Sequence, residues 1–172
     1  MAHKPYLAYA VLAGAIGFAM PAVAQNTSGS FATHAGFKDV GTVTKITDDR
    51  TIGAGTVWGV VFNDEGHGLL HMGTAICPYF SEVVGDKLSN NGECTWSDVS
   101  GDKIFTRWSG KGDMKSGALT GDQTIQGGTG KFAGIEGTAP FKCQALNSDG
   151  QFACATDWTY QIPASGSSEP KK

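Results

Sequence analysis

Two histidines four residues apart are the first candidates for chemistry in this chain. His67 and His71 could share one metal ion on a helix, since residues four apart lie on the same helical face. The segment around them is predicted as a strand, and at roughly 3.3 Å per residue the two would lie about 13 Å apart. One ion bound at about 2 Å cannot bridge that distance. We therefore expect no metal site and interpret each imidazole as a hydrogen-bonded wall residue.

The sequence contains none of the short motifs typical of common enzyme active sites. It has no G-x-S-x-G nucleophile elbow and no H-E-x-x-H zinc motif. The aspartates of segment 98–103 (DVSGDK) lack the order and the distal glutamate of a calcium loop, so we interpret them as turn residues. We assign no catalytic residue and expect no cofactor.

The first 24 residues are typical of a secretory signal peptide. Lys4 lies near the start, residues 6–20 are apolar or small throughout, and Ala22 and Ala24 form an A-x-A cleavage pattern. The apolar stretch is shorter than the roughly 20 residues that a membrane span requires. We expect cleavage before Gln25, and therefore a secreted or periplasmic protein with no membrane anchor after cleavage.

The composition narrows the class of protein. The chain has 172 residues, enough for about one domain with its own core. Its 25 glycines follow no G-X-Y period, which excludes collagen, and 40% hydrophobic residues with four tryptophans argue against intrinsic disorder. The net charge is −3 and becomes more negative when Lys4 is removed, so we expect no nucleic-acid partner.

The mature chain is predicted to be all-β. No window of 11 or more residues has a helical apolar period, whereas short runs rich in Val, Ile, Thr, Phe and Trp alternate with turn-forming clusters. The predicted strands are 40–47, 55–63, 67–76, 92–98, 102–109, 118–126, 135–146 and 151–162. They favour a closed eight-stranded antiparallel β-barrel over residues 40–163, because closure removes exposed edges; a two-sheet sandwich is the alternative. Pro140 is expected to interrupt the seventh strand. Residues 25–39 are expected to form a flexible arm, and residues 164–172 a disordered tail.

One predicted hairpin supplies candidate ligand contacts. If the turn at 63–66 is symmetric, one face of the two flanking strands carries three pairs of facing residues. These candidate pocket residues are Phe62 with His67, Val60 with Leu69, and Trp58 with His71. A mixture of aromatic rings and imidazoles is typical of a small-molecule cavity. The opposite face is also apolar, so the hairpin is expected to be buried on both sides or to lie against a partner subunit in a homo-oligomer.

The segment 127–137 (GGTGKFAGIEG) is the most informative stretch of the chain. It fails as a phosphate loop because Phe132 follows Lys131, where Ser or Thr is required, and its glycine spacing differs from the dinucleotide-binding fingerprint. We interpret it as a tight, glycine-based turn between two strands, with Phe132 packed into the core as a plug. The residues assigned to this turn are Gly127, Gly128, Gly130, Phe132 and Gly134.

This segment resembles the glycine-rich strand connection of the allene oxide cyclase and dirigent barrels, in which a similar GGTGKF-x-G-x-x-G precedes the penultimate strand. The placement agrees, since two predicted strands follow it here. Close similarity covers this segment alone. The resemblance implies an eight-stranded barrel with an apolar cavity, often in oligomers, and cofactor-free handling of oxylipin or phenolic molecules.

The four cysteines are predicted to form two disulfides. Gaps of 16, 48 and 10 residues contain no C-x₂-C pair, which argues against zinc, and an exported chain meets an oxidising compartment. A symmetric turn at 147–150 places Cys143 directly opposite Cys154 on the neighbouring strand, close enough for a bond. That leaves Cys77 to pair with Cys94, across the long connection between the third and fourth strands. The other two connectivities require one of those strands to approach the final hairpin.

The sequence thus predicts an exported β-barrel that binds a small hydrophobic or aromatic molecule in an apolar cavity. A cofactor-free isomerase or cyclase acting on an oxylipin-like or phenolic substrate is the second hypothesis. The third is a structural or interaction domain without a ligand. A cavity lined by apolar groups with few convergent polar groups would favour the first two, whereas a lumen filled by Trp and Phe would favour the third.

Overall fold

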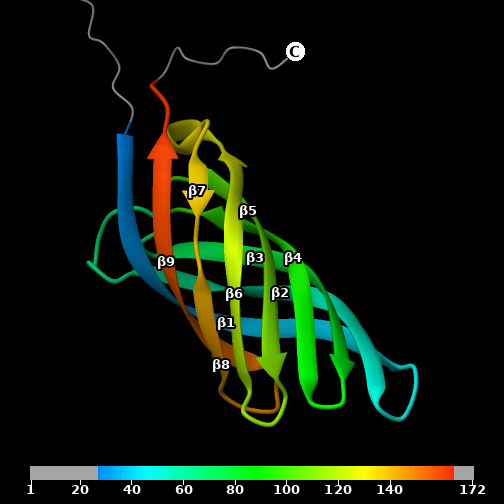
Figure 1. Cartoon of the computed structure of the whole chain (residues 1–172). Coiled ribbons are helices and arrows are strands. Elements are labelled where there is room, and N and C mark those ends of the chain that lie inside the picture. The colour runs from blue at the N-terminus through cyan, green and yellow to red at the C-terminus, as the bar shows by residue number, and fades with distance from the viewer. Residues whose placement is uncertain (1–26, 165–172) are drawn as a thin grey trace, which may run out of the picture.

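Antiparallel strands joined mostly by short turns close into a barrel in the computed structural model, which describes residues 27–164 (Figure 1). The strands are β1 (Thr27–Lys45), β2 (Arg50–Asn63), β3 (Gly73–Val84), β4 (Lys87–Ser97), β5 (Lys103–Asp113), β6 (Ala118–Gly128), β7 (Glu136–Thr138), β8 (Phe141–Ala145) and β9 (Gln151–Ile162). Strands β1 to β6 follow in sequence order, β7 and β8 both lie between β6 and β9, and β9 pairs with β1. The predicted antiparallel β-barrel is confirmed.

Strands β7 and β8 together occupy one strand position, so the barrel has eight. Between them, the backbone of Ala139 exchanges hydrogen bonds of 2.9 and 3.2 Å with Gln123, and the Asp157 N–H donates to the Pro140 carbonyl at 3.0 Å. Proline has no N–H to donate, so the ladder loses a bond there. The interruption at Pro140 is as predicted.

The first strand begins well before its predicted start. Thr33, Ala35 and Phe37 are buried, whereas the intervening His34 and Gly36 are exposed, which is the period of a strand. This stretch pairs with β2 on one side and β9 on the other. The expectation of a flexible arm over 25–39 is therefore wrong from residue 27 on. Small residues gave little strand signal, yet two flanking ladders satisfy their backbone groups.

The predicted strand 67–76 is wrong in its first half, because residues 64–72 form a loop between β2 and β3. Four residues of the loop have positive φ: Gly66 (74°), Gly68 (88°), Leu70 (58°) and Met72 (56°). A strand cannot continue through such a backbone. The Asn63 side chain holds the loop, since its Nδ2 donates to the Leu69 carbonyl and its Oδ1 accepts from the Glu65 N–H, both at 3.0 Å.

The predicted hairpin register is consequently wrong as well. Trp58 lies opposite Ile76 instead of His71, and Val60 lies opposite Thr74 instead of Leu69. Residues 78–93, expected as a connection, form most of the β3–β4 hairpin, whose turn lies between Val84 and Lys87.

The glycine-rich turn after β6 closes one end of the barrel. Gly127, Gly130 and Gly134 have positive φ of 140°, 54° and 75°, and the 3₁₀ turn Gly130–Phe132 brings the Phe132 ring to full burial. A Cβ on Gly130 would overlap the Asp102 carboxylate, so this position also requires close approach. The core position predicted for Phe132 is confirmed.

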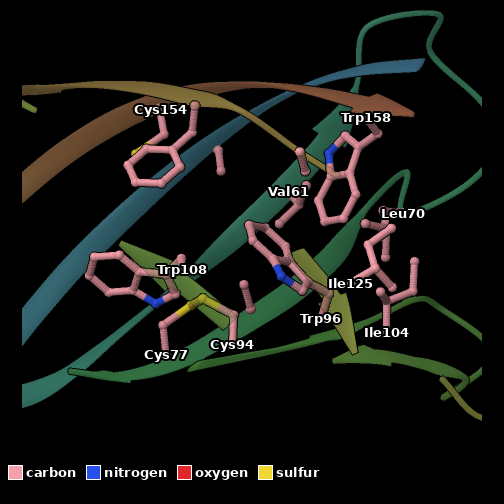
Figure 2. Close-up of a cluster of buried hydrophobic side chains, with 14 of the residues drawn as sticks. Val61, Leu70, Cys77, Cys94, Trp96, Ile104, Trp108, Ile125, Cys154 and Trp158 are labelled. Carbon is pink, nitrogen blue, oxygen red and sulfur yellow. A yellow bond between two sulfur atoms is a disulfide. The ribbon is translucent and has the colours of Figure 1, made fainter. Parts of the chain in front are cut away.

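Several large side chains pack near Phe132, where Gly128 lies against Phe132 and pairs with Ile104. Figure 2 shows Trp96, Trp158, Leu70 and Ile104 gathered together, and the two indoles meet edge to face with ring centroids 5.1 Å apart. Each indole has its polar atom satisfied, since the Trp158 Nε1–H donates to the Thr33 hydroxyl and the Trp96 Nε1–H to the Thr106 hydroxyl, both at 3.0 Å. This end of the barrel is a filled core.

Both predicted disulfides are present. Cys143 lies directly opposite Cys154 in the β8–β9 register, as the symmetric-turn argument requires, and the two are bonded. Cys77 of β3 is bonded to Cys94 of β4. The Cys77–Cys94 disulfide therefore joins two paired strands of one hairpin. It does not span a long connection between the strands, contrary to the expectation from the sequence.

The signal peptide (1–24), its cleavage site and all but the first residue of the expected tail lie outside the described residues. They stay predictions.

Candidate functional site

The half of the barrel opposite the filled core contains a cavity of about 560 Å³. Its lining reaches the β5–β6 turn (Met114, Gly117) and the β8–β9 turn (Asn147, Ser148), which lie together at the lower end of the barrel in Figure 1. Exposed Met114 marks this end as the mouth. The volume lies within the roughly 300–1,000 Å³ typical of small-molecule sites.

Six aromatic side chains supply much of the cavity wall. They are Phe37, Tyr79, Trp96, Trp108, Phe141 and Phe152. Two of them stack, since the Phe37 and Phe152 rings lie 5.3 Å apart with planes 19° from parallel. The four cysteines also line the cavity, so that both disulfides belong to its wall.

Glycines leave space for two of these rings against the barrel wall. A Cβ on Gly55 would lie 2.9 Å from the Tyr79 hydroxyl oxygen, and a Cβ on Gly121 would lie 2.6 Å from Cζ of Phe141. A Cβ at either position would also overlap the backbone of the neighbouring strand. These two wall positions therefore require glycine.

Asp39 and Tyr79 form the main polar contact in this apolar cavity. The Tyr79 hydroxyl lies 2.9 and 3.0 Å from the two carboxylate oxygens of Asp39 and donates its proton to them. Burial of the phenol, followed by the hydrogen bond and the negative charge of Asp39, raises the pKa of Tyr79 to about 12. The Asp39 N–H in turn donates to the Gly150 carbonyl at 2.8 Å. Asp39 is thus held to β3 through its carboxylate and to the β8–β9 turn through its backbone N–H.

The remaining polar groups of the lining differ in how well they are paired. Gln123 accepts a hydrogen bond from the Thr106 hydroxyl at 2.7 Å. Asp113 binds Lys87 at 2.8 Å, and this hydrogen bond is the main reason why the pKa of Asp113 falls to about 2. By contrast, Oδ1 of Asn90 and Nε1 of Trp108 are buried without a hydrogen-bond partner among the described residues. A buried polar atom without a hydrogen-bond partner destabilises the folded protein unless a bound molecule supplies that partner.

The six candidate pocket residues from the sequence do not line this cavity. Trp58, Val60 and Phe62 point outward from β2 and are 55%, 49% and 46% exposed. The other three lie in the 64–72 loop, where His67 is exposed with its Nδ1 2.8 Å from the Glu65 carbonyl, Leu69 is half-buried, and His71 packs its ring on Phe62. The inward face of β2 is the one predicted as the opposite face, and its Val57 does line the cavity.

Asp39 and Tyr79 both lie in segments that the sequence pattern does not predict as strands. Asp39 falls in the expected arm and Tyr79 in the expected connection between the third and fourth strands. The alternation Thr33, Ala35, Phe37 that precedes Asp39 was the available signal. Over residues 27–164, no group of three or more His, Cys, Asp or Glu side chains could hold a metal ion. No helix in that part of the chain is long and apolar enough to cross a membrane.

Comparison with solved structures identifies a protein with the same fold. No family model matches the chain, and no curated protein sequence matches it. Among solved structures, the pterocarpan synthase dirigent protein GePTS1 superimposes with a TM-score of 0.52, covering 90% of this chain and 99% of that one. The chain folds as a dirigent-like barrel. At 14% identity the likeness concerns the fold alone, and it does not single out the allene oxide cyclases.

Proposed function

We propose that this dirigent-like barrel binds a small hydrophobic or aromatic molecule in the cavity beneath the filled core. The observation that carries the proposal is the cavity itself, about 560 Å³ lined by aromatic rings, with Asp39 and Tyr79 as convergent polar groups. A barrel built only for structure would fill both halves of its lumen, as large side chains fill the upper half here.

We propose that the protein acts outside the cytoplasm, either secreted or in the periplasm. Two disulfides favour an oxidising compartment, and the apolar leader at residues 1–24 favours export.

An enzymatic role, as a cofactor-free isomerase or cyclase acting on a phenolic or oxylipin-like substrate, is the second candidate. It is favoured by the Asp39–Tyr79 pair, whose carboxylate keeps acceptor sites beside the Tyr79 hydroxyl and is placed to take a proton from a substrate. The two candidates differ in the fate of the ligand. A binding protein returns a co-purified molecule unchanged after incubation, whereas an enzyme converts it.

Self-association is a further part of the proposal, with a second copy of this chain as the partner. The outward side chains of β2 from Ala54 to Phe62 and of β3 from Thr74 to Phe80 carry no charge, and Trp58, Phe62, Ile76 and Phe80 among them are exposed. Sedimentation of the wild type and of Trp58→Lys tests this. A shift of the variant toward monomer supports the contact, and a monomeric wild type contradicts it.

Native mass spectrometry tests ligand binding. The full chain is purified from its exported fraction without organic solvent and measured directly, then again after incubation with N-phenyl-1-naphthylamine, a neutral apolar probe. We expect either a co-purified adduct or uptake of one probe per chain. A chain that carries no adduct and takes up no probe contradicts the proposal.

A further inference from the structure

The cavity has an unusual balance of charge. Its lining contains two aspartates, Asp39 and Asp113, and no lysine, arginine or histidine. The Asp113 carboxylate is paired with Lys87. Asp39 has no basic partner within residues 27–164, and the Tyr79 hydroxyl is the side-chain group that binds it. The apolar half of the barrel therefore holds a carboxylate without a counter-ion.

The mouth of the cavity does not supply that counter-ion. Four basic side chains that flank the turns at this end are paired with acids, in the ion pairs Lys45–Asp48, Arg50–Glu82, Lys87–Asp113 and Lys115–Asp86. Lys111 of β5 and Lys142 of β8 are exposed and do not line the cavity. Lys38 lies in the β1 register opposite outward-facing Trp58, and its ammonium donates to the Asp149 carbonyl. A ligand inside the cavity thus meets no basic side chain in its lining.

The aromatic rings of the cavity wall would also attract a positively charged ligand. The faces of indole and phenol rings attract ammonium groups, by about 0.5–2 kcal/mol according to how far the pair is desolvated. Trp96, Trp108 and Tyr79 present such rings in the same lumen as Asp39.

We propose that the ligand of this cavity is an organic cation, an apolar or aromatic amine whose ammonium group binds the Asp39 carboxylate; this inference rests on the proposed ligand-binding function. Tyr79 acts as a positioning residue, because its hydroxyl holds the carboxylate while leaving it further acceptor sites for the ammonium protons. An oxylipin-like ligand with its own carboxylate is disfavoured, since it would bring a second negative charge into an apolar site.

The test uses three naphthyl probes of matched size that differ in charge: naphthylethylamine, naphthylethanol and naphthylacetate. Affinities are measured by isothermal titration calorimetry near neutral pH on the full mature chain. We expect the amine to bind about tenfold to a hundredfold more tightly than the alcohol, as is usual for hydrogen bonds to charged groups. The carboxylate is expected to bind most weakly.

Two variants test whether Asp39 causes the preference for the amine over the alcohol. Asp39→Asn keeps the shape of the side chain and removes its charge, so the amine should bind it no better than the alcohol, while alcohol affinity is retained. Asp122→Asn removes an exposed carboxylate outside the cavity lining and should change none of the affinities. If Asp39→Asn does not fold, Asp39→Ser carries the test, because it also removes the carboxylate and should abolish the amine preference.

The outcomes separate the two proposals. Equal affinity for amine and alcohol in the wild type, or an amine preference that survives in folded Asp39→Asn, overturns the cation inference and leaves ligand binding intact. An amine preference that survives in folded Asp39→Ser overturns it in the same way. Failure of all three probes to bind the wild type contradicts the ligand-binding function itself.

Discussion

Tyr79 and Asp39 are 40 positions apart in the sequence, yet the phenol of one lies 2.9 Å from the carboxylate of the other inside the barrel. The strands that carry them, β1 and β3, lie on either side of β2. Gly41 and Gly55, paired across β1 and β2, leave room for the Tyr79 hydroxyl to reach across β2. This contact is the basis of the first prediction.

Tyr79 should titrate at unusually high pH. Its pKa is raised from 10.0 to about 12, so an ultraviolet titration of the wild type should show a tyrosine ionising there that is absent from Tyr79→Phe. In Asp39→Asn that pKa should fall but stay above 10, because burial is the larger cause and persists.

The same shift makes stability depend on pH in a defined window. A raised folded-state pKa contributes stability that is fully present below about pH 10 and is lost as pH rises through about 12. The advantage of the wild type over Tyr79→Phe in urea unfolding should therefore shrink across that window. An advantage that is constant from pH 8 to pH 12 would contradict the account.

Removing either disulfide should destabilise the barrel by a similar amount. The bonded cysteines are 17 and 11 residues apart, so the chain-entropy model gives a loss of about 3 kcal/mol for each pair. The variants are Cys77→Ser with Cys94→Ser, and Cys143→Ser with Cys154→Ser, compared by urea unfolding. Non-reducing peptide mapping checks the pairing, and a peptide that links Cys94 to Cys143 or Cys154 would contradict it.

Phe132 should be far more important for stability than an outward phenylalanine. Its ring is fully buried at the closed end, so Phe132→Ala is expected to cost about 3–5 kcal/mol. Phe105, on the outer face of β5 and 36% exposed, is the matched control, and Phe105→Ala should cost clearly less. Equal losses in guanidinium unfolding would mean that Phe132 is not a core plug.

Lys131 should stabilise the closed end through the carboxylate of Asp98. The Asp98 side chain is 3% exposed and pairs with the Lys131 ammonium. Burial by itself raises the pKa of Asp98, but hydrogen bonds from Lys131 and Ser100 outweigh it and hold the pKa below its usual value. A lowered pKa contributes stability above about pH 4 that is lost as pH falls.

Lys131→Met should accordingly lower the melting temperature at pH 7 and have a smaller effect near pH 3. Lys111→Met, which removes an exposed lysine of β5, is the control and should leave the melting temperature nearly unchanged at both values. A loss for Lys131→Met that is the same at both pH values would argue against the ion pair as its cause.

Local turn chemistry was enough to predict part of this structure. The cluster Asn147–Gly150 marks a tight turn, and the Asn147 side chain accepts hydrogen bonds from the Asp149 and Gln151 N–H groups, which fixes the register that joins Cys143 to Cys154. The glycines around Phe132 were equally informative, because their positive φ values are what a short connection between strands demands.

The β2–β3 loop and the polar pair could not be predicted in the same way. Leu70 and Met72 adopt positive φ without being glycine, held by the burial of Leu70 and by contacts that form only in the folded barrel. Asp39 meets Tyr79 through the pairing of three strands, which depends on long-range register and not on any local motif. Trp58, Val60 and Phe62 do share one face of β2, but which face points into the lumen depends on how the whole barrel closes and not on the hairpin itself.

The most direct test of the central claim uses two neighbouring valines of β3. Val83 lines the cavity near its mouth, whereas Val84 points outward and is 48% exposed. N-phenyl-1-naphthylamine fluorescence is titrated against the wild type, Val83→Trp and Val84→Trp. The wild type and Val84→Trp should bind one probe per chain with the same affinity, and Val83→Trp should lose binding, because its indole occupies the entrance. Equal binding by the two variants, or no binding by the wild type, would contradict a ligand site inside the barrel.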